Sequence, residues 1–133
     1  MAEHNRLGRA GELAACRHLE KLGYRILARN YTYAGYEADI IARDRRDLVI
    51  VEVKSRSTET GKEALSIIDR EKMAHIIAVG RAYNREYGLR LPIRYDAIAA
   101  LYRPEQGVFE IKHYKDFFRE QDIQPIAGTQ ILP

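Results

Sequence analysis

Three charged residues, Asp39, Glu52 and Lys54, occupy runs of sequence that otherwise read as buried β-strand. A carboxylate or ammonium withdrawn from water without a partner is energetically costly, so these positions require an explanation. Strand side chains alternate between two faces, which places Glu52 and Lys54 on the same face, two positions apart. Carboxylates beside an ammonium could together bind a divalent metal ion and a phosphate group.

These groups are suited to the hydrolysis of a phosphodiester bond. Mg²⁺, or Mn²⁺ in its place, prefers a few carboxylates together with waters and phosphate oxygens. We expect Asp39, Glu52 and the carbonyl oxygen of Val53 to hold the metal, which would orient and acidify an attacking water. The Lys54 ammonium would hold that water or the scissile phosphate.

Two further carboxylates are candidate metal ligands. Glu37 shares a strand face with Asp39 by the same alternation. It could bind the metal, hold a water or pair with an arginine. Glu12 lies at the edge of the apolar stripe of the first predicted helix, where a side chain could either reach the site or remain a solvated flanking residue.

The periodicity of apolar residues places these candidates on the elements of an α/β fold. Spacings of three and four predict two helices, and period-two patterns predict five strands. Short turns join the first three strands into an antiparallel meander, and the second helix predicts a parallel crossover to the fourth strand. The fold class is mixed α/β, with helices packed on one mixed sheet in the order α-β-β-β-α-β-β. The helices cover 7–22 and 63–87, and the strands cover 24–33, 36–43, 48–55, 92–102 and 107–114.

The bulk composition fits one domain over residues 1–133, with a core of about 7–114 and a tail over 116–133. The tail is expected to form a short helical turn and then an irregular end. The single cysteine, Cys16, excludes an internal disulfide and favours a reducing compartment. Neither a signal peptide nor a membrane span is indicated, so a cytoplasmic location is expected. A net charge of +3 is compatible with a polyanionic partner.

The order helix Glu12, strand Asp39, strand Glu52-Val53-Lys54 resembles the signature of the PD-(D/E)XK nuclease superfamily. More narrowly, the chain resembles the bacterial YraN-like family, which is similar to archaeal Holliday-junction resolvases. This resemblance implies a restriction-endonuclease-like αβββαβ core and a Mg²⁺-dependent endonuclease, with Glu12 added to Asp39, Glu52 and Lys54 as catalytic residues. The matching strings are Arg9-Ala10-Gly11-Glu12, Arg29-Asn30, Glu37-Ala38-Asp39-Ile40-Ile41-Ala42, Val51-Glu52-Val53-Lys54-Ser55-Arg56 and Arg94-Tyr95-Asp96.

The chain departs from the family pattern in the strand that carries Asp39. The family usually has glycine directly before its glutamate, whereas Tyr36 precedes Glu37 here, and Ala38 replaces a bulky apolar residue. The turn geometry at 35–36 and the direction of the Glu37 side chain are therefore open.

Basic residues near the site are candidate contacts to nucleic-acid phosphates. They are Arg9, Arg56 and Lys72. For Lys72, which interrupts an apolar helix stripe, snorkelling or pairing with Asp69 is favoured over a phosphate contact. Asp96 is interpreted as a structural strand residue.

The leading hypothesis is an endonuclease that acts on DNA, including branched or junction DNA, with RNA left open as the polymer. A homodimer is expected because branched substrates are roughly two-fold symmetric. Two alternatives use the same fold without cutting: a nucleic-acid-binding module and an assembly protein that uses the sheet for protein contacts.

Overall fold

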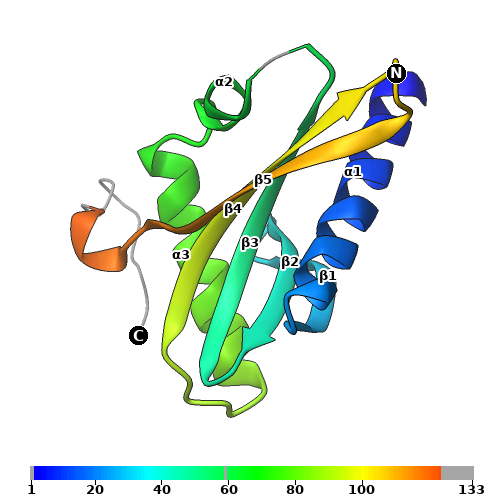
Figure 1. The fold of residues 1–133 in the computed structure, drawn as a ribbon. Helices are drawn as coiled ribbons and strands as arrows, with labels where there is room; N and C mark the ends of the chain where they lie inside the picture. Colours follow the sequence, from blue (N-terminus) through cyan, green and yellow to red (C-terminus); the bar gives the residue numbers. More distant parts are fainter. Residues whose placement is uncertain (1, 59, 124–133) are drawn as a thin grey trace.

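The computed structural model describes residues 2–58 and 60–123, which form five strands, three α-helices and a 3₁₀ helix (Figure 1). None of the helices in these ranges is long and apolar enough to cross a membrane. The elements are α1 (Ala2–Lys21), β1 (Arg25–Tyr33), β2 (Tyr36–Asp44), β3 (Asp47–Arg56), α2 (Gly61–Leu65), α3 (Arg70–Glu86), β4 (Ile93–Arg103), β5 (Val108–Phe118) and η1 (Glu120–Asp122).

All five strands form one sheet in the order β1-β2-β3-β4-β5. Neighbouring strands are antiparallel except for β3 and β4, which are parallel and joined through α2 and α3. Helix α1 covers one face of the sheet, and α2 and α3 lie on the other face (Figure 1). The predicted mixed α/β class, the meander and the parallel crossover are confirmed.

The central strand β3 supplies apolar side chains to both faces of the sheet. Leu48 and Ile50 pack in the cluster beneath α3, whereas Val49 and Val51 pack in the cluster beneath α1. Both helices approach β3 closely at a glycine. A Cβ on Gly11 of α1 would lie 1.9 Å from Ser55 Oγ, and one on Gly80 of α3 would lie 2.8 Å from Ile50 Cγ1. Such close packing of helices fixes the positions of the polar residues at the end of β3.

The single helix predicted over 63–87 is wrong, because the structure divides it into α2 and α3. Ile68 stays buried in the break, so the apolar stripe continues although the helix does not. Asp69 begins α3 as its N-cap, and its side chain accepts a hydrogen bond from the Lys72 backbone N–H at 2.8 Å. The Asp69 carboxylate therefore satisfies the backbone N–H of Lys72. The ammonium of Lys72 remains available to another partner.

Other boundaries differ at the ends of elements. Helix α1 begins five residues before the predicted start, and β5 continues to Phe118 beyond the predicted end at residue 114. In β1, a bulge between Ile26 and Ala28 turns Ala28 towards the cluster beneath α3, whereas Ile26 packs against the cluster beneath α1. The predicted helical turn in the tail is η1, and the tail over 124–133 lies outside the described residues.

Candidate active site

Strand β2 separates from β3 at Asp39, and this separation creates the candidate site. The paired register of β2 and β3 ends at Ile40 and Val51. Beyond this point the Val53 backbone N–H donates a hydrogen bond to Asp39 Oδ2 at 2.8 Å. A side-chain carboxylate therefore occupies the place of the strand partner and is fixed against β3.

A change of face in β2 accompanies the separation. Ile40 packs beneath α1, whereas Ala38, two residues earlier, packs beneath α3. Regular alternation would keep these two residues on one face. The partner strand β1 holds Asn30 at a φ of 54° opposite this position, in the left-handed region that asparagine tolerates better than most residues. The irregular pair of strands turns the start of β2 towards α3.

Glu52 is the most deeply buried charged group of the site, with 3% of its surface exposed. Its Oε2 lies 3.1 Å from Lys72 Nζ and 3.6 Å from Lys54 Nζ. Its Oε1 is buried and has no hydrogen-bond partner within residues 2–58 and 60–123. A buried acceptor left without a partner costs about 1–3 kcal/mol, and more when it is charged. A cation could satisfy this buried oxygen.

Asp39 and Glu52 are close enough to influence each other strongly. Burial and the neighbouring Glu52 carboxylate raise the pKa of Asp39 to about 8, despite the opposing hydrogen bond from Val53. Two carboxylates that share a small volume disfavour joint ionisation unless a cation lies between them. This arrangement is a feature of divalent-metal sites as well as of carboxylate pairs that share a proton.

Lys72 has a partner that the sequence interpretation did not name. Its ammonium pairs with Glu52 rather than with Asp69. Burial lowers the pKa of Lys72, but the negative charges of Glu52, Asp39 and Glu37 outweigh this effect and raise the pKa overall. Lys72 therefore stands as a second ammonium beside Lys54, delivered from the first turn of α3.

The structure does not bring Glu12 and Glu37 onto the Asp39–Glu52 pair. Glu12 Oε1 accepts a hydrogen bond from Asn30 Nδ2 at 3.2 Å and lies 3.6 Å from Arg29 Nη2. Its charge still contributes to the raised pKa of Asp39, and Glu37 is exposed. Within the described part of the chain, no three His, Cys, Asp or Glu side chains gather as a metal site.

The predicted phosphate contacts occupy different surroundings. Arg9 lines a shallow pocket together with Glu12 and Asn30, which places it beside the α1 end of the site. Arg56, at the end of β3, donates a hydrogen bond from Nη1 to the Ser55 carbonyl oxygen at 2.8 Å. Lys72 contacts a predicted site carboxylate directly, through its ion pair with Glu52.

Asp96 has the structural surroundings predicted for it. Its carboxylate accepts hydrogen bonds from Arg94 at 2.9 Å, from His113 at 2.8 Å and from the Asp116 backbone N–H at 3.0 Å. These bonds outweigh burial and lower the pKa of Asp96. The buried charge is fully compensated within the sheet, in contrast to Glu52.

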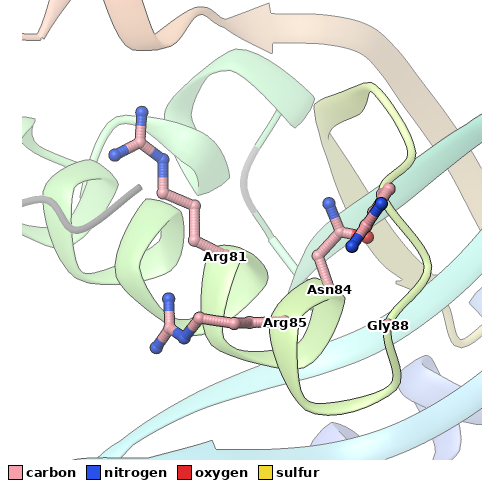
Figure 2. A pocket seen from close by; sticks show the side chains of 5 residues that line it. Arg81, Asn84, Arg85 and Gly88 are labelled. Atoms are coloured by element: carbon pink, nitrogen blue, oxygen red, sulfur yellow. The ribbon is translucent and has the colours of Figure 1, made fainter.

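A separate hollow lies at the end of α3, lined by Arg81, Asn84, Arg85, Gly88 and Arg90 (Figure 2). Arg81 and Arg85 extend in a similar direction from successive turns of the helix, and Asn84 points away from them (Figure 2). Asn84 is held by hydrogen bonds to both the Leu91 carbonyl and the Leu91 N–H, and Arg81 pairs with Glu120. Asn84 therefore closes the α3–β4 connection, and Arg81 joins α3 to η1.

The residues fit a divalent cation of the Mg²⁺ type. Such an ion is commonly held by one or two carboxylates, with waters and substrate oxygens in its remaining positions. Asp39 and the unpartnered Oε1 of Glu52 would be those carboxylates. The deduction from strand alternation named Asp39, Glu52 and Lys54. The sequence interpretation missed Asn30 as the residue that holds Glu12, and it missed Glu52 as the partner of Lys72.

The model of an uncharacterised protein family, UPF0102, matches residues 11–100 of the chain. A UPF0102 protein from Bacteroides thetaiotaomicron is 40% identical over 118 residues, covering 89% of this chain and 96% of the relative. The UPF0102 protein of Parabacteroides distasonis has the same identity and coverage. That of Flavobacterium johnsoniae is 37% identical over 122 residues, covering 89% of this chain and 98% of the relative.

Proposed function

The chain belongs to the uncharacterised protein family UPF0102, the YraN-like family that its motifs resemble, and from the site at Asp39 and Glu52 we propose that it is a metal-dependent nuclease. The proposed reaction is hydrolysis of phosphodiester bonds in DNA with Mg²⁺ or Mn²⁺. The observation that carries the proposal is the buried Oε1 of Glu52, which has no partner in the described residues although two ammonium groups flank the other oxygen.

Asp39, Glu52 and the carbonyl oxygen of Val53 would hold the metal. When bound, the ion would activate a water and stabilise negative charge on the phosphate. Asp39 is already fixed by the Val53 N–H, so little reorganisation is needed on the β2 side. Glu12 would join only by leaving Asn30 and Arg29, which now hold it.

The two lysines would have different roles in binding the substrate. Lys54 projects from the same strand face as Glu52 and would hold the attacking water or the scissile phosphate. Lys72 is partly exposed, with 41% of its side-chain surface accessible, and would contact a phosphate oxygen while it remains close to Glu52. Positive groups placed in advance around the developing charge are an effective form of transition-state stabilisation.

The test is incubation of the protein with supercoiled, linear and four-way-junction DNA in Mg²⁺, Mn²⁺ or EDTA, with RNA as a comparison polymer. We expect metal-dependent cutting by the wild type that Glu52→Gln or Lys54→Met abolishes. Glu105→Gln and Lys62→Met are matched controls, because both residues are exposed, Lys62 on α2 and Glu105 in the turn between β4 and β5. Binding without cutting in either metal would instead support a nucleic-acid-binding module, and neither activity would support an assembly protein.

A further inference from the structure

Tyr36 and His75 form a stacked aromatic pair next to the candidate site. Their ring centroids are 3.7 Å apart and the ring planes differ by 12°. Tyr36 is the first residue of β2 and directly follows the turn formed by Ala34 and Gly35, both of which have positive φ. His75 comes from the first turns of α3. The stack therefore joins the tip of the β1–β2 hairpin to the helix that carries Lys72.

Tyr36 is a large aromatic side chain that remains exposed to solvent. Of the Tyr36 surface, 43% is exposed to solvent, although His75 covers one face of the ring. Its cross-strand partner Tyr33 packs against the cluster beneath α3, whereas Tyr36 belongs to neither apolar cluster of the described residues. A large aromatic ring supported on one side and accessible to solvent provides a surface for another planar group.

The stack lies beside the groups that would receive a phosphate. His75 follows Lys72 by three positions on α3, and residues at this spacing are neighbours on a helix surface. Tyr36 directly precedes Glu37, whose charge acts on Lys72. Lys72 in turn contacts Glu52 at 3.1 Å. A nucleotide with its phosphate at Lys72 would carry its base towards the Tyr36–His75 stack.

We propose that Tyr36, supported by His75, is a stacking platform for an unpaired DNA base next to the scissile phosphate. This inference rests on the proposed nuclease function and names its substrate class. Within a duplex, each base is already stacked between its neighbours, whereas unpaired bases offer a free π-face that aromatic side chains bind. The preferred substrate is therefore DNA with unpaired nucleotides at the cut, such as a single strand, a flap or a splayed branch.

The platform predicts a loss of affinity that depends on the substrate. Stacking on an aromatic side chain contributes enough that Tyr36→Ala should weaken binding of single-stranded or splayed DNA by roughly tenfold or more. Binding of a fully paired duplex should change less than about twofold, because the duplex offers no free base face to the ring. Tyr36→Phe keeps the ring and should bind like the wild type. His75→Ala removes the support and should show a smaller loss of the same kind.

The binding measurements use fluorescence anisotropy in EDTA, so that cutting does not interfere, with circular dichroism to check that each variant is folded. Oligonucleotides that carry 2-aminopurine at an unpaired position report stacking directly. We expect quenching by the wild type and by Tyr36→Phe, but not by Tyr36→Ala. The matched control is the same fluorophore inside a fully paired duplex.

The outcomes separate the platform from the nuclease proposal. Equal losses of affinity for paired and unpaired DNA, or no loss, overturn the platform even when the wild type cuts DNA. Tyr36-dependent quenching without cutting in Mg²⁺ or Mn²⁺ supports the platform and overturns the nuclease. If Tyr36→Ala fails to fold, His75→Ala decides the question by the same comparison of the two substrates. Absence of both DNA binding and cutting in the wild type overturns both proposals.

Discussion

The ammonium of Lys72 lies 3.1 Å from Oε2 of Glu52, so the first turn of α3 supplies a counter-charge to a carboxylate buried in the central strand. The contact joins two residues 20 positions apart in the sequence, one on β3 and the other on α3, which is part of the parallel crossover to β4. It also links the start of a helix to the region where β2 and β3 separate. The position of α3 and the charge balance of the site therefore depend on each other.

Loss of the Lys72 charge should lower the stability of the metal-free protein. Lys72→Met leaves Glu52 with Lys54 at 3.6 Å as its remaining ammonium partner in the described chain. Since the Lys72 side chain is partly exposed, we expect a loss of about 1 kcal/mol in the free energy of unfolding at pH 7. Urea unfolding measures this loss in the free energy of unfolding. Lys62→Met, an exposed lysine on α2, serves as the control, and an equal loss in both variants would contradict the assignment.

Glu52 should couple metal binding to thermal stability. A ligand that binds the folded state alone raises the unfolding temperature, and the rise grows with ligand concentration. We expect Mn²⁺ and Mg²⁺ to raise the unfolding temperature of the wild type and to leave Glu52→Gln unchanged. Glu52→Gln keeps the shape of the side chain while it removes the charge, so the metal-free variant should be at least as stable as the wild type. Glu105→Gln should respond to metal as the wild type does, and isothermal titration calorimetry provides an independent check.

Asp39 should make the metal-free protein less stable as the pH rises from about 4 to about 8. Burial and Glu52 raise the pKa of this carboxyl to about 8 from an ordinary value of 3.8. In this interval the folded protein holds a proton that the unfolded chain has released, so the free energy of unfolding decreases with pH. Asp39→Asn cannot ionise and should flatten this part of the profile.

The measurement is urea unfolding at intervals between pH 4 and pH 9 in EDTA. Other titrating groups contribute to both profiles, so the difference between the wild type and Asp39→Asn carries the information. If the difference in the free energy of unfolding between the two proteins does not change with pH, the raised pKa does not belong to Asp39. A saturating divalent metal should weaken the dependence of this difference on pH, because the ion replaces the proton on Asp39.

Much of the fold follows from patterns that act over short distances along the chain. Alternating apolar residues identified the strands, and the short turn at Ala34 and Gly35 fixed the antiparallel hairpin. The break before α3 was missed because Ile68 continues the apolar stripe across it and neither glycine nor proline marks it. Asp69 was the available signal, since aspartate is a favoured N-cap residue.

In the candidate site too, the local sequence predicts some relationships between residues, and tertiary packing determines the others. Glu52 and Lys54 share a face because of strand geometry, which requires only the local sequence. The contact of Lys72 with Glu52 depends on how α3 packs across the sheet, and the stack of Tyr36 on His75 depends on the same packing. The hydrogen bond from Asn30 to Glu12 depends on how α1 packs against β1. Such relationships arise from tertiary packing, so periodicity alone does not reveal them.

Asn30 should be sensitive to replacement by alanine and tolerant of glycine. Its φ of 54° lies in the left-handed region, where a Cβ costs roughly 1–2 kcal/mol and glycine has no such cost. Asn30→Ala also loses the hydrogen bond to Glu12, and Asn30→Gly loses the same bond. The difference between the two variants therefore isolates the backbone contribution. We expect Asn30→Ala to be less stable than Asn30→Gly by about 1 kcal/mol in urea unfolding.

The control for this comparison is Thr32, a residue of β1 without a positive φ. Thr32→Gly should be less stable than Thr32→Ala, because glycine weakens an ordinary strand position. The order of stability of the two replacements should thus reverse between positions 30 and 32. The same order at both positions would show that the backbone at Asn30 is not held in the left-handed region. In that case the change of face that turns the start of β2 towards α3 would need a different cause.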